Sequence, residues 1–201
     1  MRLMDLMEPE ETMGEIWHDL AKDIGAERRY PEAAVPLESL RGALAMLFRA
    51  LGGGAGVEIT QAPPSQVRHR QALRRKLAAD QDLGYVASFD GARLRLPPVM
   101  EVFPRVDLNR AAYFWLTALA ALSPDPLPEL SDGPAADDAQ IRANAQACDR
   151  AYQRCIGLRA LYTDLAAHAL AQRPTLARPA AEEALETAIR AQLRRRPLHE
   201  P

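Results

Sequence analysis

Aromatic residues and cysteines are scarce in this chain of 201 residues. Phenylalanine, tryptophan and tyrosine together make up 5% of it, and there are two cysteines. A core with so few rings must be built from small aliphatic side chains, which suits closely packed helices. Cys148 and Cys155 lie on one predicted helix, about 10 Å apart along its axis, which is too far for a disulfide. We expect both to be small packing residues in a reducing cytoplasm.

A large excess of one charge is also missing. The chain has 25 basic and 27 acidic residues, so its formal net charge is -2. No global positive field would draw it to nucleic acid or to an anionic membrane, and we expect neither as a partner. The longest apolar run, residues 111–122, is too short to cross a bilayer, which takes about 20 residues. It predicts a central core helix in which Trp115 and Leu119 are almost fully buried.

The motifs that most enzymes carry are absent as well. There is no G-x-S-x-G elbow, phosphate-binding loop or dinucleotide fingerprint. The glycines of LGGGAG (residues 51–56) follow a predicted helix rather than a strand, and no Gly-Lys-Ser/Thr comes after them. None of the histidines (His18, His69, His168 and His199) has a second ligand at helical metal-site spacing. We expect no catalytic, cofactor-binding or metal-binding residue in the chain.

Helical periodicity is what the sequence does contain. Apolar residues repeat at steps of three and four within 9–24, 37–51 and 138–172, and a last helix begins near Pro179. Gly52 to Gly54 are expected to end the second of these helices, and Gly157 to loosen the third. Asp107 is the predicted N-cap of the apolar helix.

Two stretches switch to the alternation that is typical of strands. Residues 56–62 predict one strand, and 85–89 and 92–96 predict a hairpin that turns at Asp90-Gly91. The predicted fold class is mostly α (α+β), a helical domain with a small antiparallel sheet or hairpin insertion. We expect residues 1–122 to form a helical core with this β element. Residues 123–138 would form an acidic, proline-rich loop, and 139–201 would be helices that pack on the same domain.

A basic segment lies between the predicted strands. Residues 65–79 read as a helix that carries no acidic residue, and its charged side chains are Arg68, Arg70, Arg74, Arg75 and Lys76. Three interpretations stay open: a solvated helix paired with acidic neighbours, a docking surface for an acidic protein partner, and a nucleic-acid site. Aromatic stacking residues do not alternate with the arginines, which disfavours the third.

Four stretches in a fixed order resemble one known family. They are EPEETMGEIWH (Glu8–His18), RYPEAAVPLESLRGALAMLFRALGG (Arg29–Gly53), DGARLRLPPVMEVFP (Asp90–Pro104) and LNRAAYFWLTALAAL (Leu108–Leu122). Together they are similar to the N-terminal region of the NorD/CbbO family, over roughly the first 122 residues. The resemblance implies bacterial cytoplasmic adaptors that carry a von Willebrand factor A domain at their C-terminus and work with a MoxR-type AAA+ ATPase hexamer.

The resemblance also implies where cofactors and partners belong. The family's metal site needs an Asp-x-Ser-x-Ser segment, which this chain lacks, so we expect that site in an absent von Willebrand domain. ATP and magnesium would belong to the hexamer. The implied role is that of a non-catalytic adaptor domain, which anchors the adaptor to the hexamer so that ATP hydrolysis remodels a client enzyme. Rubisco is the client expected first, and nitric-oxide reductase is the alternative. A nucleic-acid-binding module that uses Arg68–Lys76 is the alternative of another class.

Overall fold

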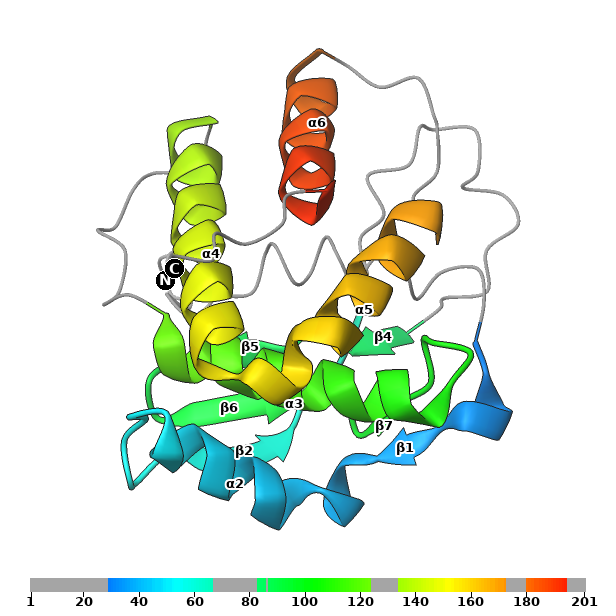
Figure 1. Cartoon of the computed structure of the whole chain (residues 1–201), viewed down its shortest axis with the longest axis vertical. Coiled ribbons are helices and arrows are strands. Elements are labelled where there is room, and N and C mark those ends of the chain that lie inside the picture. Colours follow the sequence, from blue (N-terminus) through cyan, green and yellow to red (C-terminus); the bar gives the residue numbers. More distant parts are fainter. Residues whose placement is uncertain (1–28, 67–82, 86, 124–133, 173–179, 195–201) are drawn as a thin grey trace, which may run out of the picture.

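The computed structural model describes residues 29–66, 83–85, 87–123, 134–172 and 180–194 (Figure 1). These residues form a mostly helical fold with small sheets, as predicted. The helices are α2 (Arg41–Ala50), α3 (Val106–Leu122), α4 (Pro134–Arg154), α5 (Arg159–Gln172) and α6 (Ala180–Arg194), with 3-10 turns η1 (Pro31–Ala33), η2 (Leu37–Ser39) and η4 (Ile156–Leu158). The strands are β1 (Val35–Pro36), β2 (Glu58–Gln61), β3 (Pro64–Gln66), β4 (Leu83–Tyr85), β5 (Ser88–Phe89), β6 (Arg93–Leu96) and β7 (Val99–Met100).

Helix α3 is the centre of the molecule. It packs against α2 on one side and against α4 and α5 on the other, and α6 lies against α4 and α5 (Figure 1). Eleven of its residues are buried, because almost every side chain from Leu108 to Leu122 is apolar or small. Trp115 is 1% exposed and Leu119 is 5% exposed, which confirms the prediction for this helix.

The three-stranded sheet has the predicted strands but not the predicted directions. Its order is β2-β6-β5; β5 and β6 are antiparallel, whereas β2 and β6 are parallel. The prediction of an all-antiparallel sheet is therefore wrong. Parallel neighbours need a long crossover, and residues 62–92, which include β3, β4 and β5, provide it.

The hairpin between β5 and β6 turns one residue later than predicted. Gly91 has a φ of 87° and Asp90 pairs with Arg93, so the two central residues are Gly91 and Ala92. Asp90 acts through its side chain instead: Oδ1 accepts hydrogen bonds from the backbone N–H groups of Ala92 (2.9 Å) and Arg93 (2.6 Å). A short carboxylate is favoured here because it can replace a backbone acceptor in a turn.

The glycines after α2 end that helix, as predicted. Gly52 has a φ of 103° and donates to the carbonyl of Arg49, while the N–H of Gly53 donates to the carbonyl of Phe48. These two bonds form a Schellman motif, which satisfies carbonyls that would otherwise lack partners. The helix itself is shorter than predicted, because residues 37–39 form the 3-10 turn η2.

The start of α3 corrects the predicted cap. The N-cap is Arg105, and Asp107 lies in the first turn, where it pairs with the Arg105 side chain. Buried Asn109 fastens the loop before the helix: Nδ2 donates to the carbonyls of Ala33 and Phe103, both at 2.8 Å, and Oδ1 accepts from the Phe103 N–H at 3.0 Å.

The long C-terminal helix predicted over 138–172 is two helices. α4 begins at Pro134, so the acidic loop predicted to reach residue 138 ends sooner. The helix breaks after Arg154 into η4, which contains Gly157, and α5 follows. Stacking of Trp115 on Tyr162 at 4.2 Å holds α5 to α3. Neither cysteine forms a disulfide; Cys148 is buried and Cys155 is partly buried.

Candidate functional site: a candidate protein-docking surface

The predicted partner-binding residues lie outside the described residues. These are Arg68, Arg70, Arg74, Arg75 and Lys76, within residues 67–82. Both flanks of that segment are described, because Ser65 pairs with Gly84 and Gln66 with Leu83 in the antiparallel pair β3-β4. The helix predicted from residue 65 is thus wrong for its first two residues, because they belong to strand β3.

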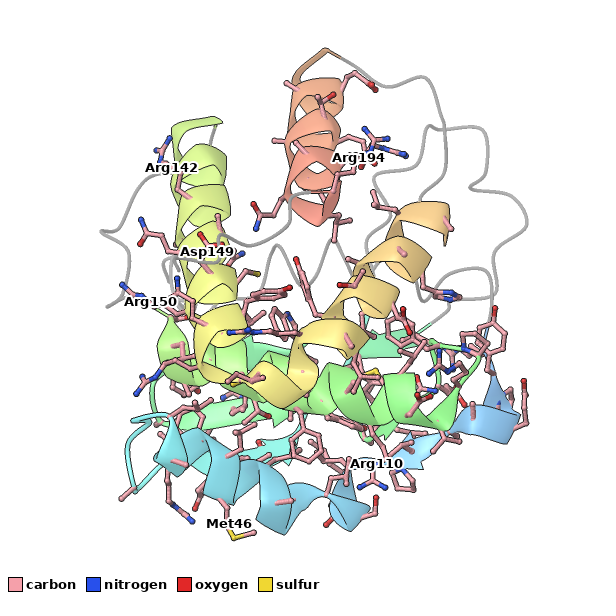
Figure 2. The ribbon with its side chains drawn as sticks, viewed as in Figure 1. Met46, Arg110, Arg142, Asp149, Arg150 and Arg194 are labelled. Carbon is pink, nitrogen blue, oxygen red and sulfur yellow. The ribbon has the colours of Figure 1, made fainter. Side chains whose placement is uncertain are left out.

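A second set of basic side chains lies on α4, where it is described. Arg142, Gln146, Arg150 and Arg154 are exposed and follow one another along the helix at steps of four residues. We call these four residues the α4 ridge. Arg142 and Arg150 point away from α6 (Figure 2). Residues at this spacing lie on neighbouring turns, so the ridge presents polar side chains over three turns of helix.

Two ridge arginines also bind the ends of other helices. Arg150 Nη1 donates to the Leu122 carbonyl at the end of α3 (3.1 Å), and Arg154 Nη1 donates to the Leu51 carbonyl that follows α2 (3.3 Å). The last carbonyls of a helix lack intrahelical partners and carry partial negative charge. The ridge is therefore fixed to the core through the C-terminal ends of two helices.

The corner beyond the ridge exposes an apolar side chain. Ile156 in η4 is 70% exposed, the most exposed of the large apolar side chains in the described residues. Arg159 stabilises this corner: Nε donates to the Tyr152 carbonyl at 2.7 Å, and the guanidinium lies 5.1 Å from the centre of the Tyr152 ring. Arginine is enriched in protein-protein contacts, so we treat the ridge and this corner as a candidate docking surface.

The first described residues, Arg29 and Tyr30, contact α5 and the loop before α3. The N–H of Tyr30 donates to the Glu101 carbonyl at 2.8 Å, and Arg29 pairs with the Glu101 carboxylate at 3.3 Å. His168 lies against the rings of Tyr30 and Phe103, and burial lowers the pKa of its imidazole. A neutral histidine among rings is a packing residue at ordinary pH.

The described residues show neither a metal-binding cluster nor an activated thiol at Cys155. Within the described ranges, no three His, Cys, Asp or Glu side chains gather in a way that could hold a metal ion. Burial raises the pKa of the Cys155 thiol, which disfavours the reactive thiolate. In the same part of the chain, none of the helices is long and apolar enough to cross a membrane.

Reasoning from the sequence missed the α4 ridge. Its arginines are separated by uncharged residues and by Asp149, so they do not form a run of charge as residues 68–76 do. The four-residue spacing of Gln146, Arg150 and Arg154 was the available signal. The carbonyl partners of the two arginines could not be foreseen, because they come from helices that lie far away in the sequence.

Comparison with known proteins gives a consistent match to one group. No established family profile matches the chain, and no solved structure does. Protein NorD of Brucella suis is 37% identical over 175 residues, which is 86% of this chain and 27% of that protein. A protein of Pseudomonas aeruginosa is 37% identical over 185 residues (92% and 28%), and Protein NorD of Stutzerimonas stutzeri is 37% identical over 115 residues (57% and 19%).

Fold and surface define the chain as a mostly helical domain with a β insertion and an arginine-rich outer face. The chain is homologous to the N-terminal part of the NorD proteins and represents that region of the NorD/CbbO family. It spans about a quarter of the length of these relatives, 27% for the Brucella suis protein.

Proposed function

We propose that this chain is a non-catalytic adaptor domain that helps a MoxR-type AAA+ hexamer to activate nitric-oxide reductase. The observation that carries the proposal is the 37% identity to NorD over 86% of the chain. The NorD/CbbO resemblance supplies the role: the adaptor is anchored to the hexamer, and ATP hydrolysis in the hexamer remodels the client enzyme. ATP and magnesium belong to the hexamer, and this domain holds no cofactor of its own.

The client in this proposal differs from the one expected first. The sequence resemblance alone favoured Rubisco, with nitric-oxide reductase as the alternative. Relatives named NorD in Brucella and Stutzerimonas support the nitric-oxide reductase branch, and the named relatives give the Rubisco reading no support. We therefore propose that the client reached through the full-length protein is nitric-oxide reductase.

The basic segment is the first candidate for the contact with the hexamer. The residues proposed for this contact follow β3 and precede β4 in the sequence, and they are Arg68, Arg70, Arg74, Arg75 and Lys76. Charge complementarity chiefly accelerates association. Reversal by Arg74→Glu/Arg75→Glu should therefore slow association with the hexamer, and added salt should reproduce that effect on the unmodified chain.

Interferometry against the purified hexamer tests this proposal. The unmodified chain should bind saturably, and the purified client alone should not bind it. A charge reversal away from a contact usually changes free energies by less than about 0.5 kcal/mol. Unchanged affinity in the double variant would remove the basic segment from the contact. No binding by the unmodified chain would show that anchoring to the hexamer needs another part of the protein.

A nucleic-acid module is the competing function of another class. Its support is limited to the arginines of the basic segment, and the net charge of -2 opposes it. Binding to duplex or single-stranded DNA that weakens steeply with salt would support it over the adaptor proposal.

A further inference from the structure

The α4 ridge is an exposed surface, with arginines already restrained by hydrogen bonds, to which the proposed function assigns no role. Gln146, Arg150 and Arg154 are exposed along one side of α4, and Arg142 extends the ridge to about 18 Å along the helix axis. Among the described residues, neither Arg150 nor Arg154 forms an ion pair with a carboxylate. The bonds of these two arginines to Leu122 and Leu51 each use one of the five N–H donors of a guanidinium.

The carbonyl bonds prepare the two guanidinium groups for a partner. An exposed arginine normally loses much rotamer freedom when it binds, and this loss weakens exposed ion pairs. Here a backbone carbonyl already restrains each side chain, so less freedom remains to be lost on binding. The two arginines are one helical turn apart, about 6 Å along the axis, and each can hold a carboxylate through two parallel hydrogen bonds.

We propose that the α4 ridge binds an acidic helical segment of a partner protein. Carboxylates four residues apart on that segment would pair with Arg150 and Arg154, and an apolar residue beyond them would cover Ile156. The proposal rests on the geometry of α4 and η4, and it holds whether or not the hexamer is the partner.

Two features favour a protein partner over a nucleic acid. Ile156, 70% exposed and two residues beyond Arg154, offers an apolar contact that a phosphate backbone would not use. The ridge contains no aromatic side chain on which a base could stack.

A titration with synthetic peptides tests the proposal on the full chain. The probe is a labelled alanine-based helical peptide of about 20 residues, long enough to be helical alone, with glutamate at every fourth position and a leucine near one end. Its control has glutamine in place of each glutamate. The glutamate peptide should bind saturably, and Arg150→Gln/Arg154→Gln should raise its Kd about tenfold through the loss of two charge pairs.

Matched variants separate the ridge from general charge. Arg110→Gln/Arg194→Gln removes two exposed arginines from other helices and should leave the Kd unchanged (Figure 2). Ile156→Ala should weaken binding of the glutamate peptide, and it should not change binding of a glutamate peptide that lacks the leucine. Arg150→Lys/Arg154→Lys keeps a positive charge and N–H donors at both sites. If the glutamine double variant does not fold, this lysine variant replaces it, and we expect it to lose less affinity for the glutamate peptide.

Three results would overturn the proposal. The first is no saturable binding of the glutamate peptide, or equal binding of the glutamine peptide. The second is a loss of affinity in the Arg110/Arg194 control variant that equals the loss in the Arg150/Arg154 variant. The third is tighter binding of a short oligothymidylate than of the glutamate peptide, with the same sensitivity to the Arg150/Arg154 change, which would assign the ridge to nucleic acid.

Discussion

Trp115 stabilises the fold through its rings rather than through its polar atom. It is 1% exposed and stacks on Tyr162, and its indole N–H has no acceptor among the described residues. Truncation by Trp115→Ala or Leu119→Ala should lower the free energy of unfolding by about 2–5 kcal/mol, from lost burial and the remaining cavity. Trp115→Phe, which keeps an aromatic ring, should cost less. Urea denaturation measures all three, and an equal loss for Phe and Ala would contradict this account.

Asn109 is a polar residue whose burial depends on its hydrogen bonds. Its side chain joins α3 to the carbonyl of Ala33 and to both backbone groups of Phe103. Asn109→Leu keeps the number and branching of the side-chain heavy atoms but leaves these buried backbone groups without partners, at a cost of about 1–3 kcal/mol each. We expect a loss of at least about 2 kcal/mol in urea denaturation. Arg110→Leu, at the next, exposed position, should change stability little, and similar losses in the two variants would contradict the assigned role.

Asp90 makes the β5-β6 hairpin sensitive to acid. The hydrogen bond from the Arg93 N–H is the main cause that lowers the pKa of the Asp90 carboxyl, and the Ala92 N–H and Arg95 also contribute. A folded-state pKa below the unfolded one gives stability that is present at neutral pH and lost as pH falls through the folded value. Asp90→Asn keeps an acceptor but loses the charge. The wild-type chain should therefore melt higher than the variant at pH 7, and the difference should shrink below about pH 5. A difference independent of pH would contradict this.

At the scale of elements, the end of α2 depends on the absence of a side chain at Gly53. A Cβ there would lie 2.1 Å from Cε1 of buried Phe48, which packs edge-on against Phe89. Gly53→Ala should therefore destabilise the chain by about 1–3 kcal/mol. Gly42→Ala is the matched control within α2: open space surrounds that position, and alanine should stabilise the helix by up to about 1 kcal/mol. Thermal melts of both variants compare the two, and a stabilising Gly53→Ala would show that Phe48 moves freely.

Some of the helices and strands could be predicted from local sequence patterns, and others could not. The apolar run of α3, the glycine end of α2 and the two strands of the β5-β6 hairpin followed from local patterns. The parallel pairing of β2 with β6 did not, because strand direction depends on the intervening crossover rather than on either strand. The break between α4 and α5 was signalled only by Gly157, since apolar residues continue at helical spacing on both sides.

For the candidate surfaces, reasoning from the sequence finds charge that is concentrated in one segment and misses charge that is spaced along a helix. The cluster from Arg68 to Lys76 is visible in the sequence, although its residues lie outside the described ranges. Arg150 and Arg154 look like ordinary solvated residues in the sequence. Their anchoring to Leu122 and Leu51 depends on tertiary packing of α4 beside the ends of α3 and α2.

At the scale of the whole molecule, the central claim is that this domain serves nitric-oxide reductase activation as part of a longer adaptor. Replacement in a denitrifying bacterium tests it most directly. One strain has the homologous N-terminal region of its NorD protein deleted, and a second has that region replaced by this chain. The measurement is nitric-oxide consumption by isolated membranes, with the amount of reductase quantified alongside.

We predict that the deletion strain contains the reductase but consumes little nitric oxide, and that the replacement strain regains activity. Full activity in the deletion strain would show that the region is not needed for activation. A replacement strain that produces the hybrid protein at normal levels, yet stays as inactive as the deletion strain, would contradict the claim that this chain performs the NorD role.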